Sequence, residues 1–101
     1  MATYTITMQD IEDYLDSKQD DEVIGVTCDG MNCLVAKAFK AKYPGCNNIL
    51  VDGIGFSVWP PLSVRWHHTS TDDAVRSCVQ RFDALDEEGR PITKREWEVA
   101  R

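Results

Sequence analysis

The spacing of apolar and polar residues changes several times along this chain, and each change marks a predicted element of secondary structure. Residues 3–8 alternate between threonines and larger apolar side chains, which predicts a half-buried strand. Apolar residues then recur three and four positions apart over residues 8–17, which predicts a helix with Thr7 as its N-cap. The short run 23–27 is almost continuously apolar, as is typical of a central strand covered on both faces.

The stretch from Cys28 to Gly45 joins that strand to a well-marked helix through a glycine turn. An apolar stripe, with lysines toward the C-terminal end, predicts a helix over residues 32–43, because the helix dipole favours cations at that end. Asp29 or Asn32 is expected to cap its first turn by accepting a backbone hydrogen bond. The proline that follows cannot continue the helix, and the glycine after it suits an exit turn.

Three antiparallel strands are predicted in the middle of the chain. Two apolar runs, residues 48–51 and 54–59, flank an Asp-Gly pair at positions 52–53, which predicts a hairpin with a type I′ turn. Proline has no backbone N–H to donate, so the two prolines that follow are expected to end the second strand. Alternation resumes over residues 62–67, which predicts the third strand.

A third helix is predicted by the most regular amphipathic pattern in the sequence. Hydroxyl and acidic residues at 69–73 are typical of a helix N-terminus. The apolar residues that follow recur three and four positions apart: Val75, Cys78, Val79, Phe82 and Leu85. In the tail, Thr93 and Glu96 match a capping box, which predicts a short terminal helix. The alternation of Trp97 and Val99 also permits a last strand.

These elements define an α+β fold in the order β-α-β-α-β-β-β-α, followed by the short tail element. We expect a mainly antiparallel sheet of four to five strands with about three helices packed on one side. A chain of 101 residues has enough apolar side chains for one modest core, so residues 1–101 are predicted to form a single domain.

The negative charge of the chain is concentrated at one end. The net charge is −6, but residues 1–30 hold eight acidic residues and one basic residue, whereas residues 31–101 hold nine acidic and ten basic residues. An acidic surface repels phosphate backbones, so direct nucleic-acid binding is not expected and a basic protein partner is favoured. A plainer interpretation is a solvated face that keeps the domain soluble. Without a signal peptide or a membrane-spanning apolar run, a cytoplasmic protein is expected.

Two stretches are candidate protein-binding surfaces. The acidic residues of the predicted first helix recur on the face opposite its apolar residues, and further acids follow it. The candidates are Asp10, Asp13, Asp16, Asp20 and Asp21. The second stretch is the aromatic and proline loop of Trp59, Pro60 and Pro61, because tryptophan is enriched at interface hot spots.

The four cysteines are expected to be reduced thiols, since no secretory signal precedes them. Cys28 and Cys33 could bind a metal together with Cys46 and the adjacent histidines 67 and 68. Their spacing matches no usual zinc ligand set, so neither a metal nor another cofactor is expected. The simpler interpretation is that the cysteines are small core and turn residues.

Cys33 has a second possible role as a nucleophile. At the first turn of a helix, the N-terminal dipole lowers a thiol pKa and favours the reactive thiolate. A cysteine hydrolase also needs a base and an orienting partner, for which His67 or His68 with Asp52 are the candidates. The sequence does not bring these residues together, so no catalytic residue is assigned.

The sequence therefore favours a small non-enzymatic protein-binding module, such as an adaptor, regulator or inhibitor. One alternative is an acidic mimic of nucleic acid that inhibits a nucleic-acid-binding enzyme, as a phage-encoded anti-defence protein would. The other is a thiol-dependent or metal-binding protein that uses Cys28 and Cys33. The chain shows no Gly-rich phosphate loop that opens a helix, and its pattern leaves the oligomeric state open.

Overall fold

The computed structural model describes residues 4–46, 48–52, 55–59 and 67–100, within which the chain forms an α+β fold of four helices and two small antiparallel sheets. The elements are α1 (Met8–Asp16), β1 (Val23–Val26), α2 (Leu34–Lys42), β2 (Asn48–Val51), β3 (Gly55–Trp59), β4 (His67–Ser70), α3 (Asp73–Asp83), β5 (Pro91–Thr93) and α4 (Lys94–Ala100). One sheet pairs β1 with β5, and the other has the order β2-β3-β4. The α+β class is confirmed, but two sheets replace the predicted single sheet.

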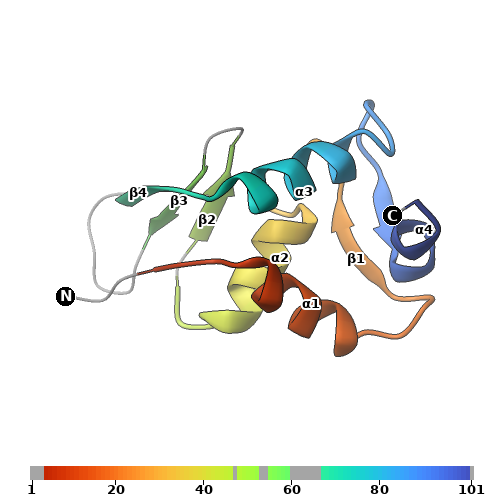
Figure 1. Cartoon of the computed structure of the whole chain (residues 1–101), viewed down its shortest axis with the longest axis horizontal. Coiled ribbons are helices and arrows are strands. Elements are labelled where there is room, and N and C mark those ends of the chain that lie inside the picture. The colour runs from red at the N-terminus through yellow and green to blue at the C-terminus, as the bar shows by residue number, and fades with distance from the viewer. Residues whose placement is uncertain (1–3, 47, 53–54, 60–66, 101) are drawn as a thin grey trace.

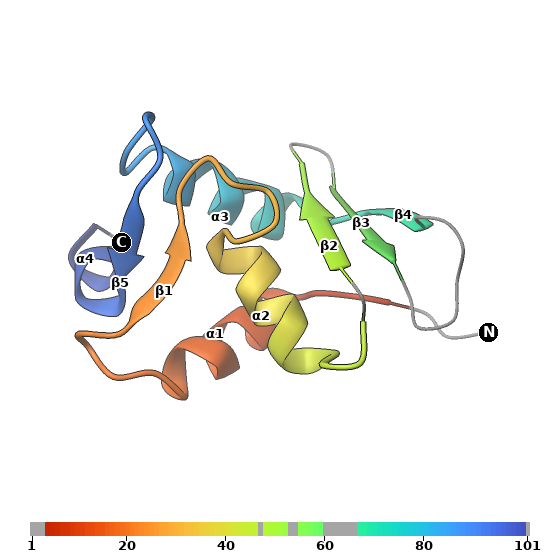
Figure 2. The same ribbon diagram turned by 180° about the vertical axis from the view of Figure 1, so that it is seen from behind.

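The two sheets lie toward opposite ends of the molecule, with α1, α2 and α3 between them (Figure 1). In the reverse view, α2 again lies between the sheets (Figure 2). This helix packs against α1, α3, β1 and β2. Its buried residues are Leu34, Val35, Ala36, Ala38 and Phe39. The apolar stripe of the sequence therefore belongs to the central core helix, not to a layer on one side of a sheet.

The predicted helix 32–43 is confirmed as α2, but its start differs. Cys33 is the N-cap, with an extended backbone and no side-chain capping bond, so the prediction of Asp29 or Asn32 as the cap is wrong. Asp29 instead accepts hydrogen bonds from the Met31 backbone and from the side chain of Asn32, and these bonds hold the turn before the helix. The helix ends before Pro44, as expected.

Helix α1 begins at the predicted cap. Thr7 and Asp10 form a reciprocal capping box, each side chain accepting a backbone hydrogen bond from the other residue. The strand predicted just before it is wrong over its described part, residues 4–7. The backbone of Thr5 donates to the Tyr43 hydroxyl and accepts from Lys42, so side chains from the end of α2 take the place of a neighbouring strand.

The strand predicted for residues 23–27 is present as β1, but it is not central. Among the described strands, β1 pairs only with the three-residue strand β5, and Val26 donates to the carbonyl of Asn32. Gly25 allows this close approach, because a Cβ atom there would lie 2.6 Å from the backbone nitrogen of Leu34. The apolar run therefore reflects packing against α2 and not a position inside a large sheet.

The predicted antiparallel pair of strands is confirmed as β2 and β3, and the predicted turn includes residue 53, which lies outside the described residues. Val51 pairs with Phe56, and the Asp52 backbone donates to Gly55, so Asp52 continues the paired strand. Residues 53 and 54 lie outside the described part of the chain, as do residues 60–66, which include most of the predicted third strand. Only residue 67 of that prediction is described, and it begins β4, a strand that extends to Ser70 and pairs antiparallel with β3.

Helices α3 and α4 follow the predicted patterns. Asp72 caps α3 by accepting from the Val75 backbone, and a capping box of Thr93 and Glu96 begins α4. The alternative of a terminal strand is wrong, because Trp97 is buried while Val99 is 81% exposed on a helix. Strand β5 was not predicted. Among the described residues, no helix is both long enough and apolar enough to cross a bilayer.

Candidate functional site

Helix α1 separates its buried residues from its acidic ones. Ile11, Tyr14 and Leu15 point into the core, while Asp13 and Asp16 are exposed. The connection from α1 to β1 adds further exposed acids, and it continues along the same side of the molecule (Figure 1). We call the exposed set the acidic face: Asp13, Asp16, Asp20, Asp21 and Glu22.

Asp10 differs from the other predicted acidic contacts because it is only partly exposed and forms a close ion pair with Lys42, whereas Asp20 lies 4.0 Å from Arg95 with both side chains exposed. Lys42 approaches Asp10 to 2.8 Å, and the Asp10 side chain is only 20% exposed. Partial burial acts to raise the pKa of Asp10, but hydrogen bonds from Lys42 and Thr7 outweigh it and hold the pKa below its usual value. Asp10 therefore joins α1 to α2 and is left out of the acidic face.

A groove of about 270 Å³ runs between α1 and α2, next to the acidic face. The α1–α2 groove is lined by Asp10, Asp13, Tyr14, Ser17, Ala38, Ala41 and Lys42. Residues three and four apart share one side of a helix, so this lining is one stripe of α1 facing one stripe of α2. The spacing within each helix can be read from the sequence, but only the folded structure shows that the two stripes face each other.

The second predicted surface is described only in part. Trp59 is half-buried at the end of β3, and Pro60 and Pro61 lie outside the described residues. Trp59 pairs with Asn48, and two positions along, on the same face of the sheet, Ser57 pairs with Leu50, which is 43% exposed. Trp59 therefore lies near the end of a sheet face that contains exposed apolar area.

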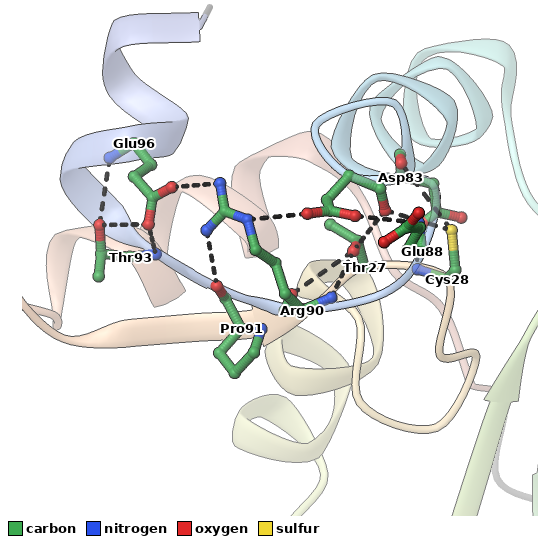
Figure 3. Close-up of polar contacts among 9 residues, drawn as sticks. Thr27, Cys28, Asp83, Glu88, Arg90, Pro91, Thr93 and Glu96 are labelled. Atoms are coloured by element: carbon green, nitrogen blue, oxygen red, sulfur yellow. Dashed lines mark hydrogen bonds and ion pairs between the residues drawn. The ribbon is translucent and has the colours of Figure 1, made fainter.

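Cys28 is exposed, but it lies next to acidic side chains. Its φ angle of 56° is in the left-handed region, and its backbone N–H donates to the Asp83 carboxylate at 2.9 Å (Figure 3). Desolvation and the nearby negative charges, Asp83 foremost, raise the pKa of the Cys28 thiol. Negative neighbours disfavour a thiolate, so this cysteine lacks the electropositive surroundings of a reactive thiol.

Cys33 is buried, as the simpler interpretation of a core cysteine expects. Its side chain is 3% exposed, and burial raises the pKa of its thiol to about 11. The backbone N–H groups of Val35 and Ala36 act in the opposite direction, as the helix dipole argument expects, but they do not compensate for the lost hydration. The charge of Asp83 disfavours the thiolate further.

Some of the residues considered for a cysteine hydrolase lie close together in the fold. His68 lies 3.4 Å from the Asp52 carboxylate, and a pocket of about 300 Å³ is lined by Cys28, Cys33 and Asp52 among others. The described residues that line this pocket include no histidine, and both thiols in it have raised pKa values. All four cysteines are free thiols, and within the described ranges no three His, Cys, Asp or Glu side chains are placed to hold a metal.

A polar cluster that the sequence did not reveal ties β1 to the C-terminal third of the chain. The buried Thr27 hydroxyl donates to the carbonyl of Asp86 at 2.7 Å and accepts from the Arg90 backbone at 2.9 Å (Figure 3). The Arg90 guanidinium also bonds the carboxylates of Asp86 and Glu96. The role of this cluster is structural, because its bonds hold Thr27 against the loop that leads into β5.

No family model, no curated protein and no solved structure matches this chain. The functional argument therefore depends on the geometry of the acidic face and its neighbouring groove.

Proposed function

We propose that this protein is a non-enzymatic binding module, acting as an adaptor, regulator or inhibitor in the cytoplasm, and that its acidic face binds a basic surface of a protein partner. The observation that carries the proposal is the exposure of the acidic face on α1 and the connection after it. In the first 30 residues the only basic side chain is Lys18, and it lies over the ring of Tyr14.

The position of these acids on α1 favours a binding role over simple solubility. The C-terminal end of a helix carries partial negative charge, so acidic residues there destabilise the helix and basic ones stabilise it. Asp16 is the last residue of α1, and no basic residue occupies its last turn. A local arrangement that costs stability is typical of surfaces selected for function.

Such a face would act first on the rate of association. Clustered charges of one sign steer an oppositely charged partner toward the surface, and salt screens this attraction over about 8 Å at physiological ionic strength. Trp59 offers a second contact of a different kind, because a partly exposed tryptophan contributes apolar area that salt does not screen. We therefore expect binding that weakens with salt.

The test is affinity capture from the native host followed by mass spectrometry, with two matched variants. The double variant Asp13→Lys with Asp16→Lys reverses the acidic face. The control, Glu87→Lys with Glu88→Lys, makes the same change of charge at exposed residues after α3. We expect one specific partner that is lost by the first variant and kept by the second.

Binding of the purified partner is then measured between 50 and roughly 500 mM NaCl, a range over which the Debye length falls severalfold. Affinity that does not change with salt, or equal loss in both variants, would contradict the proposal. A captured nucleic-acid-binding enzyme whose nucleic acid competes with this protein would identify the acidic face as a mimic of phosphates. Failure to capture any specific partner also counts against the proposal.

A further inference from the structure

We infer that the α1–α2 groove receives one lysine or arginine side chain of the protein partner. This inference rests on the proposed function and deepens it, because it locates the point at which a basic partner is anchored beside the acidic face.

The groove already contains one ammonium group. The Nζ atom of Lys42 lies 2.8 Å from Asp10 and also donates to the backbone carbonyl and the hydroxyl of Thr5. The bond to Asp10 raises the pKa of Lys42, so this ammonium group keeps its charge. Lys42 neutralises Asp10, which leaves Asp13 as the other carboxylate of the lining.

Asp13 is available to a second cation. It is exposed, and it accepts a hydrogen bond from the Gln9 amide at 2.9 Å. In the described part of the chain Asp13 makes no ion pair. A neutral amide does not cancel the charge of a carboxylate, so the attraction for a basic group of the partner is retained.

The rest of the lining suits the stem of a long basic side chain. Ala38 and Ala41 of α2 and Tyr14 of α1 also line the groove. Lysine and arginine bury their methylene groups on apolar surface while their charged ends stay near water. An apolar residue would shield Asp13 from water without pairing it, which costs free energy, and an acidic residue would be repelled.

The volume limits the occupant to the size of a side chain. Small-molecule sites usually measure about 300–1,000 Å³, and this groove, at about 270 Å³, is smaller. It is also too small for a helix or strand. A single side chain projecting from a partner that covers the acidic face therefore fits both the volume and the charge.

The experiment uses the full chain, labelled with ¹⁵N, and three synthetic peptides that differ at one position. Each peptide is a short Gly-Ser sequence with arginine, lysine or norleucine at its centre. We expect the arginine and lysine peptides to shift the amide resonances of Asp13, Ala38 and Ala41. The norleucine peptide, which has a stem without a charge, is expected to cause no such shifts.

Two variants test the groove itself, each with a matched control. Ala41→Leu fills the groove without changing charge, and Ala74→Leu makes the same change at an exposed position of α3. Asp13→Asn removes the charge of the groove wall, and Glu88→Gln removes one exposed carboxylate charge outside both the groove and the acidic face. We expect at least tenfold weaker peptide binding for Ala41→Leu and Asp13→Asn, and unchanged binding for both controls.

Several results would overturn the inference. These are shifts spread over all exposed acids, shifts caused equally by norleucine, and peptide binding that survives Ala41→Leu. If the captured partner is lost with the Asp13→Lys and Asp16→Lys variant but kept with Ala41→Leu, the groove inference fails and the proposed function stands. If the peptides bind in the groove but no specific partner is captured, the proposed function fails while the groove remains a site for a basic side chain.

Discussion

Thr27 shows how one buried hydroxyl can hold distant parts of this chain together. It is 1% exposed, and it donates to the Asp86 carbonyl while accepting from the Arg90 backbone. The Thr27 backbone N–H also donates to the carbonyl of Arg90. A single residue thus pairs both backbone groups of Arg90 and fixes the loop that leads into β5.

Replacing Thr27 with valine is expected to lower the free energy of unfolding by about 1–3 kcal/mol, because the backbone groups that bond the hydroxyl lose their partner in a buried place. Valine keeps the shape of threonine, so the loss would measure the hydroxyl. Thr27→Ser, which keeps the hydroxyl, is the control. Urea unfolding checks this prediction, and it fails if valine costs no more than serine.

The sequence predicted residue roles where they depend on local spacing. The exposure of Asp13 and Asp16 followed from the helical pattern of α1, and Thr7 was recognised as its cap. The roles of Thr27 and Cys33 could not be found in this way. Thr27 bonds a residue 63 positions away, and the thiol of Cys33 is governed by burial that only the packed core creates.

At the level of secondary-structure elements, α1 has a C-terminal end whose charge is unfavourable for helix stability. Its N-terminus has a capping box, but its last residue is Asp16 and its last turn has no basic residue. The binding proposal explains this arrangement as a feature kept for recognition. Stability and binding should therefore respond in opposite directions to a change at this residue.

The variant Asp16→Lys is expected to raise the free energy of unfolding by about 0.3–1 kcal/mol at low salt, because a cation replaces an anion at the negative end of the helix. Asp21→Lys, which makes the same change of charge outside any helix, is the control. Unfolding in urea at low and high salt measures both. Equal effects of the two variants would show that net charge, and not the helix end, is responsible.

The helices were predicted better than the strands, for a physical reason. Caps and amphipathic stripes are local signals, and all the helices of the described chain had at least one of them. A five- or six-residue alternation is a weaker signal, so residues 4–7 were wrongly assigned to a strand. β5 was not predicted because three residues beginning with Pro91 carry no detectable period.

At the scale of the whole molecule, two small sheets share one helical core. The sequence offered no means of placing β1 and β5 in a separate sheet, because their pairing depends on contacts between the two halves of the chain. The position of the loop around Cys28 likewise depends on a distant residue, because its backbone donates a hydrogen bond to Asp83 of α3. The α+β class could be predicted from the spacing of apolar residues, whereas the division of the strands into two sheets could not.

The carboxylates and thiols of the fold predict a stability plateau near neutral pH. Hydrogen bonds from Asn32 and from Arg90 lower the pKa values of Asp29 and Glu96, and the pKa of Asp10 is also lowered despite partial burial. Groups of this kind stabilise the fold above their unfolded pKa, about 4. That contribution is lost as the pH falls through the folded values.

The alkaline limit follows from Cys33. Its pKa rises from 9.0 to about 11 on folding, so its contribution is complete below pH 9 and declines as the pH approaches 11. Urea unfolding at a series of pH values checks both limits. Asp10→Asn should reduce the loss below pH 4 while Asp21→Asn does not, and Cys33→Ala should reduce the loss above pH 9.

The pairing of β1 with β5 also matters while the chain is being synthesised, because the two strands are far apart in the sequence. Thr27 leaves the ribosome 63 residues before Arg90, which at about 5–20 residues per second is a delay of roughly 3 to 13 s. During that time the β1 edge that later receives β5 has no strand to pair with. An unpaired apolar edge can pair with other nascent chains, so translation speed over residues 28–90 would influence how much of the protein aggregates.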